Sequence, residues 1–122
     1  MAATTESVRH ADFLISEAPG TLSRETITVA SGQGALVAGT VLGKITSGGE
    51  YGAYDDDNND GTETAVGILL HNIDATSAAV KATIIVRLAE VSDAKVTWAS
   101  TNDAGDKTAG KADLAAKYIV FR

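Results

Sequence analysis

The chain has 122 residues, the usual size of one domain, and it contains no cysteine, which excludes disulfides and cysteine-based zinc or redox sites. Its formal net charge is −6 and its basic residues are scattered, which argues against nucleic-acid binding, because that needs clustered Lys and Arg. No apolar run is long enough for a transmembrane helix, and the N-terminus lacks the pattern of a signal peptide. We therefore expect a protein that stays or assembles where it is made, with no membrane partner.

Alanine supplies much of the apolar content, and aromatic residues are few: two Phe, three Tyr and one Trp. Small side chains bury little area each, and burial stabilises by only about 25 cal/mol per Å² of apolar surface. The core should therefore be modest. Self-association is a natural way for such a chain to bury more surface.

Residues 1–24 differ in composition from the rest of the chain. They contain the only proline and a short apolar cluster among polar residues, made of Phe13, Leu14 and Ile15 with Leu22 further along. Two interpretations stay open. The segment is either a flexible tail or an arm that becomes ordered when a partner offers a groove or a sheet edge. In both, residues 25–122 form the folded domain.

A β pattern begins at residue 25. Four segments with β-branched or alternating apolar residues predict strands: Thr26–Val29, Val41–Ile45, Tyr51–Tyr54 and Ala65–Leu70. Gly48 and Gly49 can supply the positive φ that a tight turn requires, so the second and third of these segments should form a hairpin.

The longest strand pattern spans residues 82–91, and a short strand is expected over Val96–Trp98. The alanine-rich stretch 108–117 predicts one short helix, and Tyr118–Phe121 predicts a final strand. The fold class is therefore mainly β: one compact domain with a short C-terminal helix, preceded by the N-terminal arm of residues 1–24.

The acidic loop after residue 54 holds the strongest candidate for a metal site. Asp56, Asn58 and Asp60 match the first half of an EF-hand calcium loop. The second half fails, because Gly67 stands where the bidentate Glu is required and lies inside a predicted strand. Only Glu63 is near enough in sequence to complete the site. A solvated turn is the favoured interpretation.

No catalytic constellation stands out. The two histidines are His10 and His71, and nothing in the sequence places a particular serine or acid beside His71. Two histidines without cysteine also make a transition-metal site a poor expectation. We therefore expect no enzyme activity and no cofactor, and we expect Trp98 to lie in the core or at a subunit contact.

Several segments, taken in order, resemble the lambda D-type head decoration proteins of tailed bacteriophages. They are Ser23–Val29, Ala38–Ile45, Tyr51–Tyr54, Asp60–Leu69 and Lys111–Phe121. The resemblance extends over most of the chain. It depends on the order and spacing of these segments, since none of them is a catalytic signature.

This resemblance implies a β-rich fold, often described as a β-clip, and a homotrimer at three-fold and quasi-three-fold positions on the outside of the mature capsid. In that family the N-terminal arm becomes ordered on the shell, where it pairs with the major capsid protein. For this chain the resemblance implies a structural protein of the virion that stabilises the capsid against the pressure of packaged DNA.

The expected capsid-binding residues lie in the arm and the first strand: Phe13, Leu14, Ile15, Leu22, Thr26, Ile27 and Val29. Leu14, Ile15 and Leu22 would fill apolar pockets on the partner, and Thr26 to Val29 with the preceding residues would supply main-chain hydrogen bonds to a sheet edge. Two alternatives stay open: another β-rich phage structural or adaptor module, and a calcium-dependent protein that uses the acidic loop.

Overall fold

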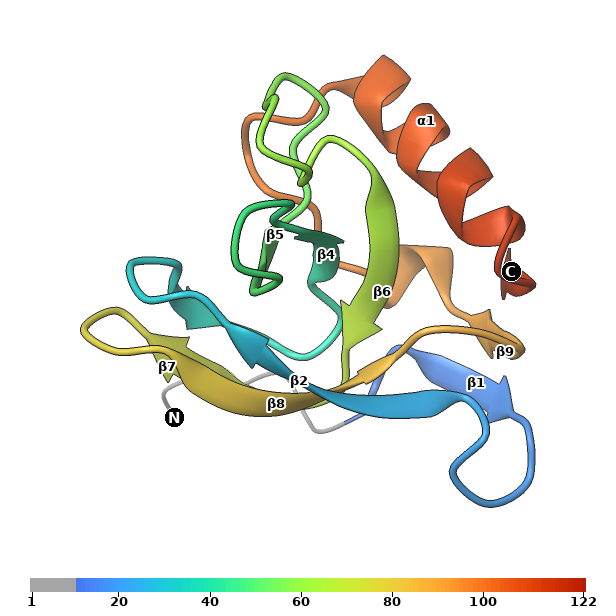
Figure 1. Cartoon of the computed structure of the whole chain (residues 1–122). Coiled ribbons are helices and arrows are strands. Elements are labelled where there is room, and N and C mark those ends of the chain that lie inside the picture. The colour runs from blue at the N-terminus through green and yellow to red at the C-terminus, as the bar shows by residue number, and fades with distance from the viewer. Residues whose placement is uncertain (1–10) are drawn as a thin grey trace, which may run out of the picture.

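A computed structural model describes residues 11–122 of the chain (Figure 1). Strands dominate it, and within the described residues the one α-helix is α1 (Ala104–Ala115), which lies along one side of the strands. The predicted fold class, mainly β with one short C-terminal helix, is confirmed.

The largest sheet is a closed barrel with the strand order β2-β5-β4-β6-β8. Its strands are β2 (Arg24–Val29), β4 (Val41–Lys44), β5 (Tyr51–Ala53), β6 (Ala65–Leu69) and β8 (Val80–Ile85). Strands β4 and β5 are antiparallel neighbours, which confirms the predicted hairpin. β2 pairs with β8 along its whole length, whereas its pairing with β5 consists of one position, Val29 opposite Tyr51. The barrel is therefore least complete between β2 and β5.

A second sheet has three short strands in the order β1-β9-β10. These are β1 (Leu14–Glu17), β9 (Ala89–Val91) and β10 (Ile119–Phe121). The central β9 is antiparallel to β1 and parallel to β10, so the two ends of the described chain meet on one strand. A third sheet pairs β3 (Gly34–Leu36) with β7 (Ile73–Ala75) at the opposite end of the molecule (Figure 1).

Two strand predictions differ from the structure. The predicted continuous strand 82–91 is wrong, because β8 ends at Ile85 and β9 begins at Ala89. Leu88 lies between them with a φ of 52°, a left-handed conformation that no extended strand contains. The expected strand over Val96–Trp98 is reduced to one bridge, between Thr97 and Thr40, which follows a turn of 3-10 helix (Asp93–Lys95).

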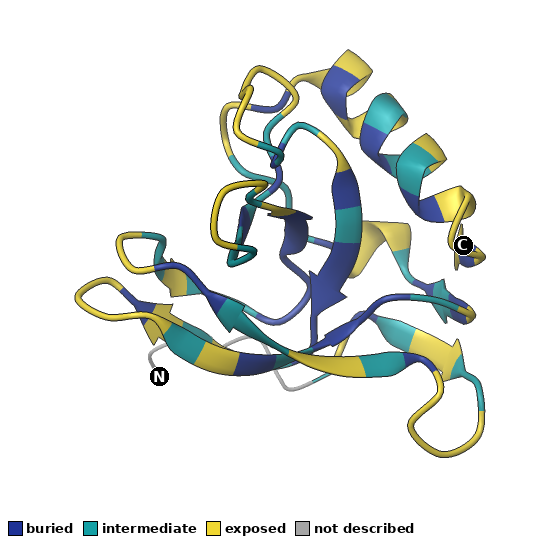
Figure 2. Ribbon diagram, in the orientation of Figure 1, coloured by how far each residue is buried: buried dark blue, intermediate teal, exposed yellow. Residues whose placement is uncertain are grey.

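Two clusters of buried side chains form the core. Figure 2 colours the buried residues dark blue along the ribbon. The first joins the barrel to α1 and the three-stranded sheet, and it includes Phe13, Tyr54, Leu114 and Ile119. The second lies between β2, β8 and the strands opposite, and it includes Val29, Leu42, Leu69 and Ile84. Within residues 11–122, every buried side-chain nitrogen or oxygen has a hydrogen-bond partner.

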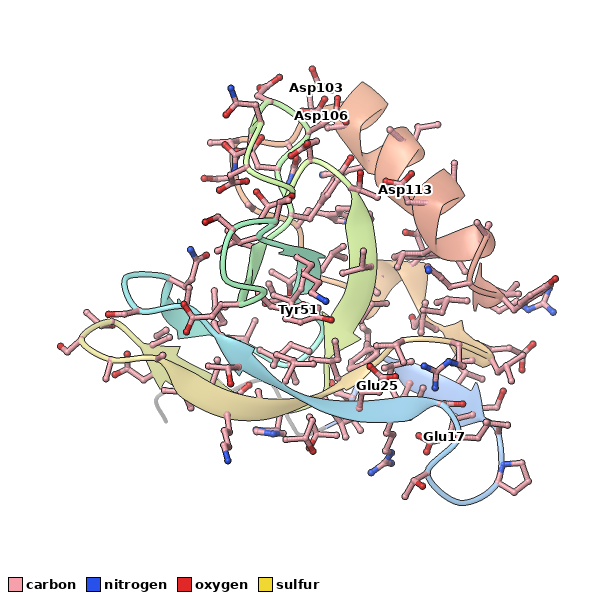
Figure 3. All side chains as sticks on the ribbon, in the orientation of Figure 1. Glu17, Glu25, Tyr51, Asp103, Asp106 and Asp113 are labelled. Carbon is pink, nitrogen blue, oxygen red and sulfur yellow. The ribbon has the colours of Figure 1, made fainter. Side chains whose placement is uncertain are left out.

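The helix begins at Ala104, earlier than the predicted start at residue 108, because Asp103 caps it. The N–H of Asp106 donates to Oδ1 of Asp103 at 2.9 Å, and the N–H of Asp103 donates to Oδ2 of Asp106 at 3.0 Å. This reciprocal pair satisfies two main-chain donors at the start of the helix. Both aspartates lie at that end of α1 in Figure 3.

The segment before β2 is part of the folded domain from residue 11 onward, which differs from the expected boundary at residue 24. Phe13 is 1% exposed and packs in the first core cluster, and β1 pairs with β9. The N–H of Ala11 donates to the carbonyl of Leu70 at 2.7 Å, which fastens the start of this segment to the end of β6. Residues 1–10 of the predicted arm, with His10, lie outside the described part of the chain.

Candidate interaction surface

Large exposed hydrophobic residues gather around the three-stranded sheet. In the described chain they are Ile15, Leu22, Leu88, Tyr118 and Val120, with exposed fractions of 53%, 54%, 40%, 71% and 41%. Each lies on a strand of this sheet or in a connection next to it. We call these five residues the apolar surface. Single exposed apolar residues are common, but a group on one small sheet marks a place where a partner can bind.

Backbone geometry turns two of these side chains outward. Leu88 and Tyr118 have φ values of 52° and 61°, in the left-handed region that costs a residue with a side chain about 1–2 kcal/mol. Hydrogen bonds hold both residues there: the N–H of Leu88 donates to Lys117 at 3.2 Å, and the N–H of Ala89 donates to the carbonyl of Tyr118 at 3.1 Å. Strained backbone of this kind is concentrated at functional sites.

Polar contacts join the loop that contains Leu22 to the connection that contains Leu88. The hydroxyl of Ser23, which is fully buried, donates to the carbonyl of Leu88 at 2.9 Å and accepts from the N–H of Ala18 at 3.0 Å. The guanidinium of Arg87 donates to the carbonyl of Leu22 at 2.6 Å. The loop between β1 and β2 is therefore attached to the β8–β9 connection, and its apolar residue is held in place.

A charged side chain with two hydrogen-bond partners, Glu90, lies on the central strand of the same sheet. Glu90 accepts hydrogen bonds from Ser16 at 2.7 Å and from Arg122 at 3.0 Å, and it lies opposite Val120. The hydrogen bond from Ser16, and then that from Arg122, hold the pKa of Glu90 below its ordinary value, so the carboxylate stays charged at neutral pH. The surface thus combines apolar side chains with a fixed, paired charge, which suits binding a protein.

The two outer strands of this sheet each have an edge without a paired strand in the described chain. In the described chain β1 and β10 each pair with β9 only, so each keeps one edge without a neighbouring strand. An unpaired edge offers main-chain groups to which another strand can be added.

The structure separates the arm residues that were expected to bind the capsid. Ile15 and Leu22 are exposed and belong to the apolar surface. Phe13 is a core residue, so it cannot fill a partner's pocket while the domain stays folded. Leu14 is partly buried, packs against the first core cluster and lies opposite Val91.

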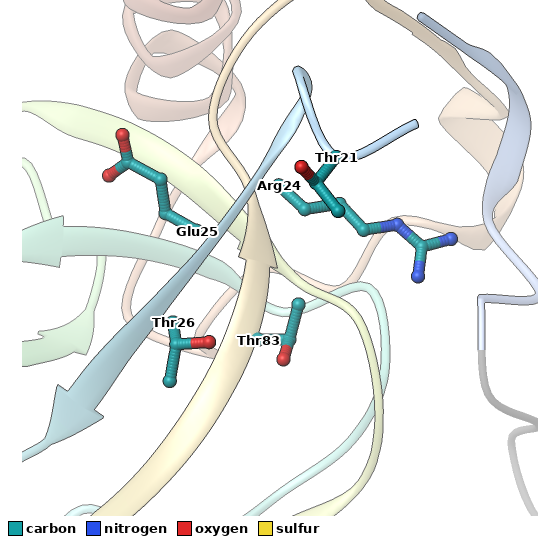
Figure 4. Close-up of a pocket in the computed structure, with 5 residues that line it drawn as sticks. All are labelled: Thr21, Arg24, Glu25, Thr26 and Thr83. Atoms are coloured by element: carbon teal, nitrogen blue, oxygen red, sulfur yellow. The ribbon is translucent and has the colours of Figure 1, made fainter. Parts of the chain in front are cut away.

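The expected residues of the first strand lie in β2, which already pairs with β8. Val29 is fully buried and Ile27 is partly buried against the second core cluster, so their side chains belong to the core of the domain. Thr26 is exposed and lines a shallow pocket on the outer face of β2 and β8 (Figure 4). In that pocket Arg24 forms a two-bond ion pair with Glu17, at 2.8 and 3.0 Å.

Leu88, Tyr118 and Val120 were not predicted to be exposed, because short apolar runs are typical of buried strands. The available signal was the run Tyr118–Phe121 itself. Successive side chains of a strand point to opposite faces, so a run in which every residue is apolar exposes some of them unless both faces are covered.

The acidic loop is closed by its own hydrogen bonds. Oδ1 of Asp60 accepts from the N–H of Thr62 at 3.0 Å and from its hydroxyl at 2.5 Å, which lowers the pKa of Asp60. Asn58 donates to the same hydroxyl at 2.9 Å, and Asp56 accepts from Tyr54 at 3.3 Å. Over residues 11–122 no three His, Cys, Asp or Glu residues are grouped so that they could hold a metal ion.

The remaining chemical candidate, His71, has a structural contact: its Nε2 accepts from the N–H of Thr83 at 3.3 Å, at the end of β6. Trp98 packs edge-on against Tyr54 and stacks on Phe121, with ring centroids 5.8 and 6.3 Å apart, beside the core as expected. None of the helices in the described chain is long and apolar enough to cross a membrane.

Comparison with known proteins gives one clear result. The family model of the bacteriophage lambda head decoration protein D matches residues 3–119. A search of curated proteins found no match. The matched range includes the barrel, the three-stranded sheet up to Ile119, and α1. The chain therefore belongs to the lambda head decoration protein D family, whose members decorate the capsids of bacteriophages.

Proposed function

We propose that this capsid decoration protein binds as a homotrimer to three-fold sites on the outside of the mature shell, where it contacts the major capsid protein and reinforces the lattice. The observation that carries the proposal is the apolar surface, in which the exposed large hydrophobic residues of the described chain lie on two strands of the three-stranded sheet and in the connections beside it. A second support is the pair of unpaired strand edges beside it.

Burial of these side chains can supply the binding energy. Burying a fully exposed Leu or Ile side chain contributes about 1.5–3 kcal/mol, and the Leu and Ile side chains of this surface are only about half exposed, so each contributes less. A single copy therefore binds weakly once the entropy cost of association is subtracted. In a trimer three such surfaces engage a three-fold site together, and the second and third contacts form at high effective concentration.

Stabilisation of the shell then needs no chemical step. A protein that binds the mature lattice better than the immature or broken one shifts the equilibrium toward the mature lattice by mass action. Residues 1–10 extend this surface in our proposal, because they lead directly into Ala11 and β1. In it they pair with an edge of a capsid-protein sheet.

The test is cosedimentation of the protein with mature shells that lack any decoration protein. Ile15→Asp and Tyr118→Asp should each weaken binding at least tenfold, because a charge is placed where apolar contact is needed. The conservative changes Ile15→Val and Tyr118→Phe are the matched controls and should bind as the unchanged protein does.

Removal of residues 1–10 should leave a folded protein that binds shells more weakly. Sedimentation equilibrium should give the mass of a trimer. Failure of the unchanged protein to bind mature shells would refute the proposal, and binding confined to another part of the virion would identify it as a different β-rich structural module.

A further inference from the structure

A groove of about 230 Å³ opens where the barrel is least complete. Residues from β2, β4, β5, β6 and the segment after β8 line it, together with one residue that follows α1: Glu25, Lys44, Tyr51, Val66, Val86, Arg87 and Lys117. Glu25 and Tyr51 lie on the side of β2 that faces β4 and β6 in Figure 3. Two of the lining residues are aliphatic, Val66 and Val86, and four are charged.

The main chain of β2 presents one edge to this gap. The N–H of Val86 donates to the carbonyl of Ser23 at 2.9 Å, which places Ser23 and every second residue after it toward β8. The N–H of Ala30 donates to Tyr51 at 2.9 Å, which places the alternate residues toward β5. Thr26 is one of the residues whose main-chain groups point toward β5. In the described chain β5 meets β2 at Val29 only, so no strand lies opposite Thr26 on this side.

The groove is positively charged although the protein is strongly acidic. Three cations, Lys44, Arg87 and Lys117, line the groove together with one carboxylate, Glu25. Arg87 pairs with Glu25 at 2.5 Å, and the three cations and one anion leave a charge of +2. The whole chain has a formal charge of −6. The Nζ of Lys44 lies 6.0 Å from the centre of the Tyr51 ring, at the entrance to the gap.

The groove continues into the apolar surface. Arg87 and Lys117 directly precede Leu88 and Tyr118 in the chain, and Arg87 also donates to the carbonyl of Leu22. A polypeptide that covers Leu88 and Tyr118 therefore lies close to two residues that line the groove.

We propose that this groove binds an extended, acidic segment of the capsid protein. Its carboxylates pair with Lys44 and Lys117, an apolar side chain rests on Val66 and Val86, and its main chain pairs with β2 at Thr26. This inference rests on the proposed capsid binding. The protein's own residues 1–10 are a poor occupant, because Glu6 is balanced by Arg9 and the segment has no net negative charge.

The test compares two double variants with the same change in charge. Lys44→Glu with Lys117→Glu alters the groove, and Lys81→Glu with Lys107→Glu alters exposed positions on β8 and α1. Binding to mature shells is measured at low and at moderate salt. The groove variant should bind at least tenfold more weakly than the control variant at low salt, and the difference should shrink as salt screens the charges.

Thermal melting of both variants checks that they fold. If the groove variant does not fold, the neutral double variant Lys44→Gln with Lys117→Gln replaces it. This variant should still bind mature shells at least threefold more weakly than its control, Lys81→Gln with Lys107→Gln. Binding of the groove variant within twofold of the control overturns the inference and leaves the proposed function intact. If the unchanged protein does not bind mature shells, the proposed function is overturned, and this inference with it.

Hydrogen exchange on decorated shells tests the main-chain part separately. Strand addition should slow exchange at the amides of Thr26 and Thr28, which face the gap, while those of Glu25 and Ile27 are already bonded to β8 in the unbound protein. Unchanged exchange at Thr26 and Thr28 on a saturated shell would exclude the added strand.

Discussion

The hydroxyl of Tyr54 donates a hydrogen bond to the main-chain carbonyl of Asp106 at 2.8 Å, and this bond attaches the first turn of α1 to the barrel. Tyr54 is fully buried, and burial, followed by the charge of Asp56, raises its pKa so that the hydroxyl remains a donor. Tyr54→Phe leaves the carbonyl of Asp106 without this partner and should lower the free energy of unfolding by about 1–3 kcal/mol in urea denaturation. Tyr118→Phe, at an exposed position, should change it by less than about 0.5 kcal/mol.

Gly110 allows α1 to approach the ring of Trp98. A Cβ at Gly110 would lie 2.7 Å from Cζ3 of Trp98 and 3.0 Å from Cε1 of Tyr54. Gly110→Ala gains about 1 kcal/mol in helix propensity, but overpacking of this kind costs about 1–3 kcal/mol, so a net loss of stability is expected. Thr108→Ala on the exposed face of α1 is the control and should be neutral or slightly stabilising. An increase in stability for Gly110→Ala would contradict the packing.

Phe13 and Ile15 are two positions apart in the chain, but Phe13 should contribute to stability and Ile15 to shell binding. Phe13→Ala removes a core side chain and should cost about 3–5 kcal/mol of unfolding free energy. Ile15→Ala changes an exposed residue and should leave stability within about 0.5 kcal/mol of the unchanged protein while weakening shell binding. Denaturation and cosedimentation of both variants check this. Equal stability of the two variants would place Phe13 outside the core.

Asp106 should make stability depend on pH. The N–H of Asp103 lowers the pKa of Asp106, but burial and the charges of Asp103, Asp57 and Asp56 outweigh that bond, so its pKa lies above the ordinary value. A carboxyl whose pKa is higher in the folded state supports folding when protonated, and that support is lost as pH rises through the folded pKa. Asp106→Asn keeps an oxygen for the N–H of Asp103 and removes the charge.

We therefore expect Asp106→Asn to be more stable than the unchanged protein at pH 7. The difference should fade as pH falls below about 3.9, the ordinary pKa of an aspartate, where both side chains are neutral. Urea denaturation at pH 7 and at pH 3 measures it. A difference that grows toward low pH would contradict the raised pKa.

Calcium should neither bind to the acidic loop nor change the Tm of the protein. The loop oxygens of Asp56 and Asp60 accept hydrogen bonds from Tyr54 and Thr62, and a calcium ion needs six to eight oxygen ligands arranged around one point. Calorimetric titration with calcium should show no binding, and the Tm should be the same with calcium or with a chelator. A rise in Tm with calcium would instead support the partial EF-hand pattern in this loop.

Local pattern predicted the strands that carry alternating or β-branched residues, such as β2, β4 and β6. It did not predict β1, β3 and β7, which are three or four residues long and exist because distant segments pair with them. Ser16 in β1, for example, bonds to Glu90, 74 positions away. The break at Leu88 was equally hidden, because a left-handed residue between two strands is imposed by its tertiary hydrogen bonds.

The candidate surface was predictable only where apolar residues stand out among polar ones. Ile15 and Leu22 do so, and the structure exposes both. Phe13 has the same sequence context as Ile15, and only packing against the barrel distinguishes the two. The basic groove had no sequence signal, since Lys44, Arg87 and Lys117 are far apart in the chain and the barrel brings them together.

The central strand β9 takes its two neighbours from opposite ends of the chain, β1 and β10. While a ribosome is making the protein, the residues of β10 emerge long after β1 and β9, so the sheet stays unfinished until translation has passed Phe121. Leu88 and Tyr118 are fixed only then, because the bond between Leu88 and Lys117 needs the end of the chain. The finished apolar surface therefore forms only after the residues of β10 have been added to the sheet.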